Sequence, residues 1–492
     1  MSLLDINKFL SQFQYNASEP LIFNSGFFLF VFPVFLIIYF LLSSKHRPKL
    51  TFVTIFSLYF YYKSSGIYFL ILIASTVVDY TLANFIYQAS TKNKKIALLI
   101  FSLVVNLGLL GYFKYTNFFF EIFAGVSGNE FKPFDIFLPV GVSFFTFQSL
   151  SYTLDIYRGN LKPVSNILDY AFFVSFFPQL VAGPIVRASE FIPQIYQPTF
   201  VTKQMFGRAV FLISTGLFKK AIISNYISLN FVDRIFDAPT LYTGLENLFG
   251  VYGYALQIYC DFSGYSDMAI GIALLLGFHF CLNFDSPYQS KNITEFWRRW
   301  HMSLSTWLRD YLYFSLGGNK KGKFRTYLNL ILTMLLGGLW HGASFRFILW
   351  GGLHGVALAF HKVITSMKIN IGVKRNSILN VLSVIITFHF ICFCWIFFRA
   401  PDMTIAGQVL TQIFTQLSTH VFPEFISGYP YVLLLMILGY VLHFIPKSIE
   451  AKAENIVTNM HLSLKIIFLV AMIVLVIQTK SAGIQPFIYF QF

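Results

Sequence analysis

Charged side chains are scarce in this chain of 492 residues. Asp, Glu, Lys and Arg together make up 12% of it, whereas hydrophobic residues make up 56%. In soluble globular domains about a quarter of the residues are charged. The shortage excludes an ordinary soluble domain and indicates a protein embedded in a membrane. Because no ten-residue alternating pattern typical of membrane β-strands is found, we expect an all-α fold.

Cysteine is also scarce, and the four cysteines fall in or beside apolar stretches without a CxxC pair. This excludes a secreted disulfide framework and the common zinc signatures, so no metal site is expected. The sequence "GGNKKGKF" resembles a phosphate-binding loop, but Phe324 stands where Ser or Thr should hold magnesium, and no strand precedes it. We interpret it as a basic turn, and we expect no bound cofactor.

Long apolar stretches fill most of the chain. They predict a polytopic protein with roughly ten to thirteen membrane helices in a single domain over residues 1–492. Several stretches are shorter than the roughly 20 residues of a perpendicular span, so we expect interfacial, re-entrant or buried helices among them. Residues 1–20 are predicted to be an N-terminal interfacial segment. The stretches are 21–42, 67–86, 96–112, 135–154, 172–186, 210–223, 269–280, 328–339, 345–364, 378–398 and 431–445.

The net charge of the chain is +15, and basic residues cluster in loops between these stretches. Lys45, Arg47 and Lys49 come after the first stretch, and the sequence "KNKK" at 92–95 comes after the stretch 67–86. Basic short loops face the cytoplasm, which leaves the N-terminus outside. Since the other basic residues are scattered among membrane loops, nucleic-acid binding is not expected.

Residues 291–325 break the apolar pattern and predict a basic amphipathic helix and loop. Asn292 and Glu295 resemble a capping box, and Gly317 and Gly318 are stop signals. Helical spacing places Arg298 on a polar face and Trp300 on an apolar face, with His301 near the edge of the apolar face. We expect one continuous helix lying at the membrane interface. From spacing alone, His301 fits an interfacial histidine as well as a functional one.

His341 is the most unusual residue of the chain. It ends the apolar stretch that begins after Arg325, 16 residues earlier, which is about 24 Å of helix at about 1.5 Å per residue. An ionisable side chain at such depth favours a functional role over a core histidine bonded between helices. Residues 326–365 are therefore predicted to be the helices that carry the catalytic histidine, with His354 packing near it.

Two further polar clusters interrupt apolar sequence. In "YCDFSGYSDMAIG", which begins at Tyr259, the carboxylates of Asp261 and Asp267 could orient a histidine, bind a donor headgroup or cap the following helix; we interpret Asp267 as the cap. In "SFFPQLVAGPIVR", proline and glycine around Gln179 predict a broken helix that protein or a cavity must cover.

These segments together resemble the membrane-bound O-acyltransferase family, in its bacterial alginate O-acetyltransferase type. The resemblance rests on "VGVSFFTFQSLSYTLDIYRG", "FFPQLVAGPIVR", "YCDFSGYSDMAIGIALLLGF", "NFDSPYQSKNITEFWRRWHMSLSTWLRDY" and "GGLWHGASFRFILWGGLHG", and it spans roughly residues 20 to 480. It implies a helical bundle around a central funnel in the bacterial inner membrane. The family's intramembrane catalytic histidine falls on His341 and its second histidine on His301.

The resemblance also implies the chemistry. An acetyl group would pass from a cytoplasmic thioester, acetyl-CoA or a carrier-bound acyl group, to a hydroxyl of an exported polysaccharide or to an exported partner acetyltransferase. We expect neutral His341 to be the general base and His301 to position the donor carbonyl or hydrogen-bond the oxyanion. Supporting or substrate-binding roles are expected for Trp340, Asp261, Tyr259, Arg298, Trp300, Gln179 and His354.

A second class of function remains open on the residues alone. A transporter or flippase could use His341, His301 and Asp261 as a proton relay. Transporters often contain paired broken segments in two related halves, and no such repeat is recognisable here. The acceptor could be alginate, cellulose, peptidoglycan or another exported glycan, because no residue pattern in the sequence identifies a particular sugar.

Overall fold

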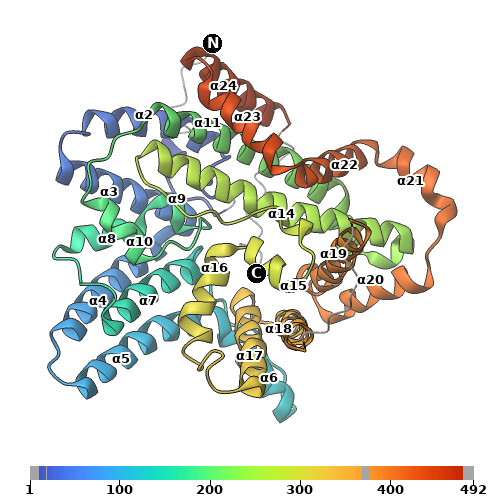
Figure 1. Cartoon of the computed structure of the whole chain (residues 1–492), viewed down its shortest axis with the longest axis horizontal. Coiled ribbons are helices and arrows are strands. Elements are labelled where there is room, and N and C mark those ends of the chain that lie inside the picture. The colour runs from blue at the N-terminus through green and yellow to red at the C-terminus, as the bar shows by residue number, and fades with distance from the viewer. Residues whose placement is uncertain (1–9, 18, 368–376, 480–492) are drawn as a thin grey trace. The chain divides into compact units, whose positions relative to one another are not determined.

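The computed structural model describes residues 10–17, 19–367 and 377–479, and the regular secondary structure of these residues is helical, with no strand (Figure 1). The predicted all-α fold is therefore confirmed. Backbone contacts group the chain into two compact units. Unit 1 holds the described residues up to Ile213 together with Met268–Cys281, and unit 2 holds Ser214–Asp267 and residues 282–479. The single domain predicted over 1–492 stays a prediction, and the predicted N-terminal segment lies mostly outside the described residues.

Unit 1 is built around three helices, α4, α5 and α7, which pack side by side (Figure 1). Asp79 of α4 is fully buried and accepts hydrogen bonds from Ser102 (3.3 Å) and Asn106 (2.7 Å) of α5. Polar bonds of this kind join helices where no water competes for the groups. The helices of unit 1 are α2 (Gly26–Leu41), α3 (His46–Ser65), α4 (Phe69–Gln88), α5 (Lys92–Leu110), α6 (Thr116–Ser127), α7 (Val142–Arg158), α8 (Ile167–Ser175), α9 (Phe177–Leu180), α10 (Ala188–Ile195) and most of α11 (Lys203–Leu217).

The break predicted around Gln179 is confirmed. α8 stops at Ser175, and the single turn of α9 follows before the chain reaches α10 at Ala188. Gln179 is fully buried in α9, and its side-chain amide donates to the backbone carbonyl of Phe173. The broken backbone is thus covered by protein, as a helix interruption in a membrane requires.

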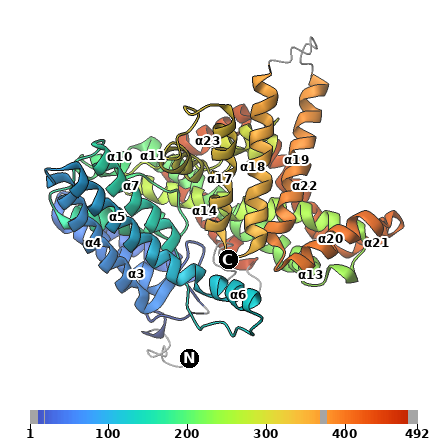
Figure 2. The same cartoon turned by 90° about the horizontal axis from the view of Figure 1, so that it is seen from below.

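Unit 2 contains the long helix α14 and a bundle of three helices, α17, α18 and α19, which run side by side (Figure 2). α14 continues past Asp267 into residues of unit 1. The main helices of unit 2 are α12 (Asn225–Ile227), α13 (Asp233–Asp237), α14 (Gly244–Leu275), α15 (Ile293–Arg299), α16 (Met302–Trp307), α17 (Lys323–His341), α18 (Phe345–Ser366), α19 (Ser377–Arg399), α20 (Met403–Thr415), α21 (Phe422–Gly428), α22 (Pro430–Phe444), α23 (Lys447–Asn459) and α24 (Leu462–Gln478).

Within the described ranges, four helical segments are long and apolar enough to cross a membrane, or up to six if each bent pair is one span. The bent pairs are Thr419–Gly428 with Pro430–Phe444, at 96°, and Lys447–Asn459 with Leu462–Gln478, at 117°. Other predicted segments form shorter or interrupted helices: the stretch 210–223 is divided between α11 and a π-helix, η3 (Phe218–Ser224). This agrees with the expectation that short apolar stretches are re-entrant or buried.

α17 and α18 form a hairpin whose backbones touch. A Cβ atom added to Gly351 of α18 would lie 2.2 Å from the carbonyl oxygen of Met334 in α17, and one added to Gly338 would lie 2.2 Å from the carbonyl oxygen of Phe347. Only glycine allows this approach, which membrane helices use to gain dispersion contacts. The hairpin matches the helices predicted over 326–365.

Replacing Gly351 by alanine should destabilise the protein by roughly 1–3 kcal/mol, because the new methyl group must push two backbones apart. The neighbouring Gly352 is the matched control, since a Cβ there would meet only the Leu335 side chain at 3.4 Å. Thermal unfolding of both variants in detergent tests this. Equal midpoints for Gly351→Ala and Gly352→Ala would show that the hairpin is looser than described.

Candidate active site

His341 is the last residue of α17 and is 3% exposed. Its ring lies 5.0 Å from the ring of Trp350 on α18 and 5.2 Å from that of Phe398 on α19, centroid to centroid. Trp340 precedes it, with the two rings 4.9 Å apart. The predicted place at the end of an apolar helix is confirmed, and the imidazole faces aromatic side chains of unit 2 rather than lipid or bulk water.

His301 lies at a sharp corner between α15 and α16, not inside a continuous helix. Its φ and ψ are 41° and 54°, in the left-handed region, and Ser286 is the other non-glycine residue with positive φ among the described residues. The prediction of one helix from Asn292 to Gly317 is therefore wrong. Helical spacing did not reveal the break, because the residues on both sides of it keep the buried apolar pattern. The predicted cap is confirmed, since Asn292 accepts from the backbone N–H of Glu295 at 2.9 Å.

The corner is held by a second backbone segment of unit 2. The N–H of Met302 donates to the carbonyl of Asn283 at 2.9 Å, and the N–H of Asp285 donates to the carbonyl of Arg299 at 2.9 Å. These bonds satisfy backbone groups that the break removes from the helical pattern. A strained conformation of this kind persists only where the surroundings over-determine it, and such residues cluster at functional sites.

The His301 side chain is fully buried. Its Nδ1 lies 3.2 Å from the side-chain oxygen of Asn283, and its ring packs edge-on against Phe262 at 4.6 Å and near Phe284 at 6.3 Å. Burial lowers the pKa of His301 to about 3, because the charged imidazolium is poorly solvated there. His301 is therefore neutral at physiological pH. The sequence predicted it near the edge of the apolar face of a helix, whereas in the structure its side chain is buried inside unit 2.

A continuous series of aromatic contacts joins the two histidines; we call it the aromatic network. Neighbouring rings in it are 5.0 to 6.3 Å apart, within the range of favourable aromatic pairs. The series runs from His341 through Trp350, Trp395, Trp300 and Phe284 to His301. It draws on α17, α18 and α19 and on the segments around α15, so distant parts of the sequence meet in unit 2.

Two of the predicted supporting residues belong to this network or touch it. Trp300 is 1% exposed and is one of its members. His354 is fully buried, lies 4.7 Å from Trp350 ring to ring, and accepts a hydrogen bond on Nδ1 from the indole N–H of Trp297 at 3.2 Å. That bond places the proton of neutral His354 on Nε2. Tyr259 lies at the border, 6.2 Å from Phe284 and 4.4 Å from the ring of His443.

Other predicted residues are placed elsewhere. Arg298 is exposed on α15. Asp261 is buried in α14 and pairs with Lys220 of η3. Gln179 lies in unit 1, in the covered turn of α9.

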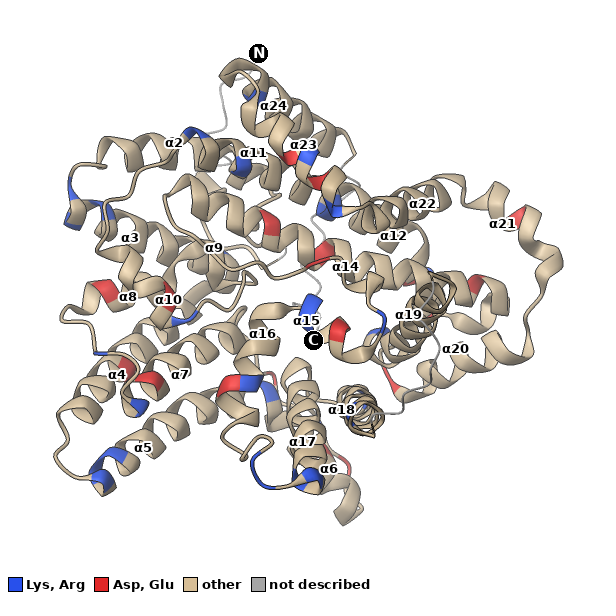
Figure 3. Cartoon of the chain, viewed as in Figure 1, with Lys and Arg blue, Asp and Glu red and all other residues tan. Residues whose placement is uncertain are grey.

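Asp267 does not cap a helix. It lies in the middle of α14, where acidic positions appear within the ribbon in Figure 3, and it pairs with Lys219 at 2.7 Å. The polar run around it resembled a helix start because carboxylates are rare inside apolar helices. In the structure Lys219 and Lys220 of η3 neutralise Asp267 and Asp261 of α14, and π-helices such as η3 are common at functional sites.

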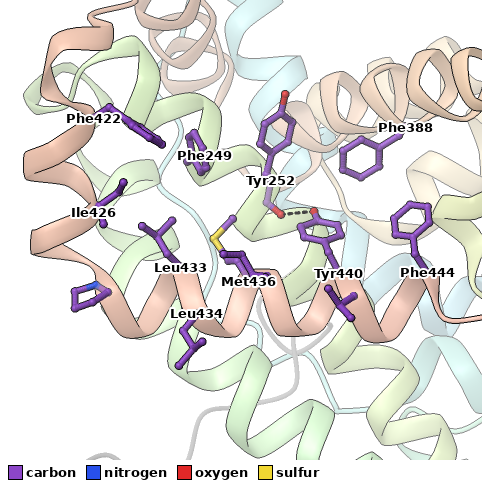
Figure 4. A pocket seen from close by; sticks show the side chains of 13 residues that line it. Phe249, Tyr252, Phe388, Phe422, Ile426, Leu433, Leu434, Met436, Tyr440 and Phe444 are labelled. Atoms are coloured by element: carbon purple, nitrogen blue, oxygen red, sulfur yellow. Dashed lines mark hydrogen bonds between the residues drawn. The ribbon is translucent and has the colours of Figure 1, made fainter.

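An apolar groove of about 740 Å³ also lies in unit 2, between α14, α19, α21 and α22 (Figure 4). Phe249, Phe388 and Tyr440 are among its lining residues, and Tyr440 donates to the carbonyl of Tyr252 at 2.8 Å. Phe388 contacts Tyr288, which in turn contacts Trp300, so the groove adjoins the aromatic network. With no ionisable group other than tyrosine in its lining, it can hold hydrocarbon but supplies no base.

Four residues of the site were not predicted from the sequence: Asn283, Phe284, Trp350 and Trp395. Asn283 stands 18 residues before His301 in an irregular segment, and no periodicity connects the two. Trp350 and Trp395 lie in apolar stretches, where a tryptophan is indistinguishable from ordinary core. No group of three His, Cys, Asp or Glu side chains suited to a metal ion is found in the described part of the chain.

A helical membrane protein with buried neutral histidines and an aromatic interior is suited to chemistry that must exclude water. The comparison with known families is specific: residues 161–399 match the family described as MBOAT, membrane-bound O-acyltransferase. Relatives of similar length support the same assignment. The chain therefore belongs to the membrane-bound O-acyltransferase family and is a multi-pass membrane O-acyltransferase, which decides against the transporter or flippase alternative.

Among these relatives is a protein named as a probable alginate O-acetylase, AlgI, from Pseudomonas aeruginosa. It is 41% identical to this chain over 402 residues, which cover 80% of this chain and 75% of the relative. A peptidoglycan O-acetyltransferase from Helicobacter pylori is 39% identical and covers 79% of each chain. A teichoic acid D-alanyltransferase from Bacillus subtilis is 32% identical over 53% of this chain and 68% of the relative.

The buried state of His301 predicts a pH dependence of stability. Its pKa is lower in the folded chain than the ordinary value of 6.5, so the unfolded state takes up the proton first as the pH falls. The contribution of the buried neutral imidazole to the free energy of unfolding is therefore present above the ordinary pKa of 6.5 and is progressively lost as the pH falls below it. The described contacts of His301 (Phe262, Asn283, Phe284 and Ser303) include no charged group.

The measurement compares unfolding of the wild type and His301→Gln between pH 7.5 and 5. The wild type should lose more stability than the variant, since glutamine takes up no proton. Parallel pH curves for the two proteins would mean that His301 is accessible to water.

The Lys219–Asp267 pair predicts a coupling energy. In a double-mutant cycle with Lys219→Met and Asp267→Asn, the two changes should be non-additive by roughly 0.5–3 kcal/mol, because each single change leaves a largely buried charge without its partner. The exposed pair Lys447–Glu450 (2.9 Å) is the control and should couple more weakly. Additive effects at 219 and 267 would show that the ion pair contributes nothing to stability.

Proposed function

We propose that this O-acyltransferase moves an acetyl group from a cytoplasmic thioester to a hydroxyl of an exported polysaccharide, either directly or through an exported partner acetyltransferase. The names of the relatives support an acyl group and a polymeric acceptor, since they specify alginate, peptidoglycan and teichoic acid. The alginate O-acetylases, at 38–41% identity, favour acetyl. We place the protein in the bacterial inner membrane, where a cytoplasmic donor and an exported acceptor can both be reached.

The observation that carries the proposal is the pair of buried histidines joined by the aromatic network. Transfer to an alcohol requires a base near neutrality, because a hydroxyl must lose its proton as it attacks the thioester carbonyl. His301 and His341 are each enclosed by unit 2. In surroundings of this kind, interactions with developing charge are stronger than in water, and a reactive acyl group is shielded from hydrolysis.

We assign the reaction to His341 and His301 together: one imidazole takes the hydroxyl proton while the other contacts the acyl donor. Trp340 and Trp300 each stand next to one of these histidines in the chain, and both are buried, so they help to enclose the imidazole rings. His354 is a neighbour of Trp350 and supports the network rather than the reacting atoms. No bound cofactor is required, since the thioester is a co-substrate.

The donor is acetyl-CoA or an acyl group on a carrier protein. Lys320 and Lys321, in the loop before α17, and Lys323, the first residue of α17, are exposed, and a cluster of cations there attracts the phosphates of coenzyme A or an acidic carrier. The same lysines also satisfy the rule that cytoplasmic loops are basic. The exposed Arg298 and the buried Asp261, Tyr259 and Gln179 remain supporting candidates.

The test uses purified protein in detergent or vesicles with radiolabelled acetyl-CoA and a polysaccharide or partner acceptor. His341→Ala should abolish label transfer, and His301→Gln should reduce it by roughly 10²–10⁴-fold, the usual contribution of a positioned acid or base. His389→Gln is the control, because His389 bonds to Tyr252 (2.9 Å) and to its own helix outside the aromatic network. Transfer that survives both site substitutions would refute the assignment.

A further inference from the structure

Two arginines lie at the end of the α17, α18 and α19 bundle that carries His341. Arg346 is the second residue of α18, and Arg399 is the last residue of α19. Arg346 is 9% exposed, and the Arg399 side chain is 15% exposed. Because an arginine keeps its charge in proteins, holding two guanidinium groups away from water is costly unless acceptors or anions lie beside them.

Arg346 contacts the backbone beside His341. Its Nη1 donates to the carbonyl oxygen of Phe398 at 2.7 Å, and its guanidinium lies 4.1 Å from the centroid of the Phe347 ring. The ring of Phe398 is 5.2 Å from that of His341, centroid to centroid. Phe398 thus contacts both this cation and the histidine.

Arg399 has a carboxylate partner, but not all of its donors are used. Its Nη2 lies 2.6 Å from Oδ1 of Asp233, which also accepts from the hydroxyl of Ser228 at 2.7 Å. Nε of Arg399 is buried and has no hydrogen-bond partner among the described residues. A buried donor left unpaired is costly, and a charge-assisted bond to an incoming anion would satisfy it.

Tyr254 of α14 brings a second unused group to the same part of unit 2. It is fully buried, and its ring lies 5.9 Å from that of Phe236, on which the Arg399 guanidinium also packs at 5.3 Å. Arg399 and Arg346 both act electrostatically on Tyr254. The tyrosine hydroxyl has no hydrogen-bond partner within the described ranges. A hydroxyl and a guanidinium N–H that are both buried and unpaired, near two cations, indicate an anionic ligand.

The topology gives these arginines an unusual place. α17 begins with Lys323 and Arg325, and α18 carries Lys362 near its far end. By the positive-inside rule, that end of the bundle faces the cytoplasm. Arg346 and Arg399 lie at the opposite end, where the rule does not account for basic residues. Ionisable groups retained in such places mark substrate sites.

We propose that Arg346, Arg399 and Tyr254, which we call the anion subsite, bind a carboxylate or phosphate group of the acceptor polymer on the exported side of His341. The inference rests on the proposed acyl transfer and adds the chemical class of the acceptor, which is an anionic polymer rather than a neutral glycan. Guanidinium groups match the geometry of both anions, and the tyrosine hydroxyl adds a donor. An anion held beside Phe398 brings the neighbouring hydroxyl of the polymer to His341.

The first test measures binding without acyl transfer. The probes are an oligouronate, the same oligouronate with its carboxylates reduced to alcohols, and an oligomer of similar length that bears phosphodiesters. Purified protein in detergent should bind at least one anionic probe roughly 10- to 100-fold more tightly than the neutral one, the usual effect of hydrogen bonds to a charged group. The tighter anionic probe identifies carboxylate or phosphate as the ligand. Equal binding of all three probes, or no binding of either anionic probe, would overturn the proposal.

Tyr254→Phe separates binding from folding. The variant removes a hydroxyl that bonds to no described residue, so its thermal midpoint should not fall, whereas its affinity for the anionic probe should fall roughly 10-fold. Tyr152→Phe is the matched control. Tyr152 is fully buried in unit 1 and accepts from the backbone N–H of Val164 at 3.0 Å, so this variant should lose stability and keep wild-type affinity. Wild-type affinity in Tyr254→Phe would contradict the assignment.

Arg399→Gln tests the cation and should weaken binding of the anionic probe roughly 10- to 100-fold, with no effect on the neutral probe. Because this change leaves Asp233 without its ion pair, the double variant Asp233→Asn/Arg399→Gln serves as a second, charge-balanced form and should show the same loss. Arg234→Gln is the charge-matched control, since Arg234 is exposed and adjacent to Asp233 in α13. Wild-type affinity in both Arg399 variants would place the anion elsewhere, for example at the lysines before α17, and refute the subsite.

Acyl-transfer assays distinguish this inference from the proposed function. With the wild-type protein, the anionic acceptor should have a lower KM than its reduced, neutral form. Equal KM values with measurable acetyl transfer would refute the anion subsite and leave the proposed function intact. Tight, Arg399-dependent binding of the anionic probe without any acetyl transfer would refute the proposed function and leave the subsite intact.

Discussion

The corner at His301 is the constraint on which the site depends. A helix that ran straight from Asn292 onward would rotate successive side chains by a fixed angle, and Trp300 and His301 would diverge. The backbone N–H of Met302 donates to the carbonyl of Asn283, and that of Asp285 donates to the carbonyl of Arg299. These bonds let the chain turn, so the side chains of Trp300 and His301 both enter the interior of unit 2. These few bonds replace those that a regular helix would have made, and they bring Asn283 within reach of the imidazole.

The second histidine depends on close packing rather than on a corner. His341 ends α17, and its surroundings come from α18 and α19. The glycines that let α17 and α18 touch therefore decide how near Trp350 comes to the imidazole. His301 is thus positioned by a hydrogen bond to a loop residue, and His341 is positioned by aromatic rings on neighbouring helices. The aromatic network joins the two.

Much of this could be predicted from the sequence. Apolar stretches gave the helical class, the end of one such stretch located His341, and proline and glycine located the break at α9. The failures have a common cause: the position of a carboxylate or a histidine was inferred from its neighbours in the chain. Asp267 follows polar residues as a cap would, but its partner Lys219 lies 48 residues away. Likewise, the helical periodicity used to predict the position of His301 could not reveal its contact with Asn283. A hydrogen bond between residues 18 positions apart produces no periodic pattern in the sequence.

The lysine–carboxylate pairs of η3 and α14 bear on how the chain is assembled in the bilayer. Lys219 and Lys220 are synthesised well before Asp261 and Asp267, so the cations leave the ribosome without their counter-ions. An unpaired ammonium group is expensive to insert into hydrocarbon. α14 is absent from the helices apolar enough to cross on their own. In the folded chain, Asp267 and Asp261 neutralise Lys219 and Lys220, so the cost of holding these lysines away from water falls only once α14 has joined η3.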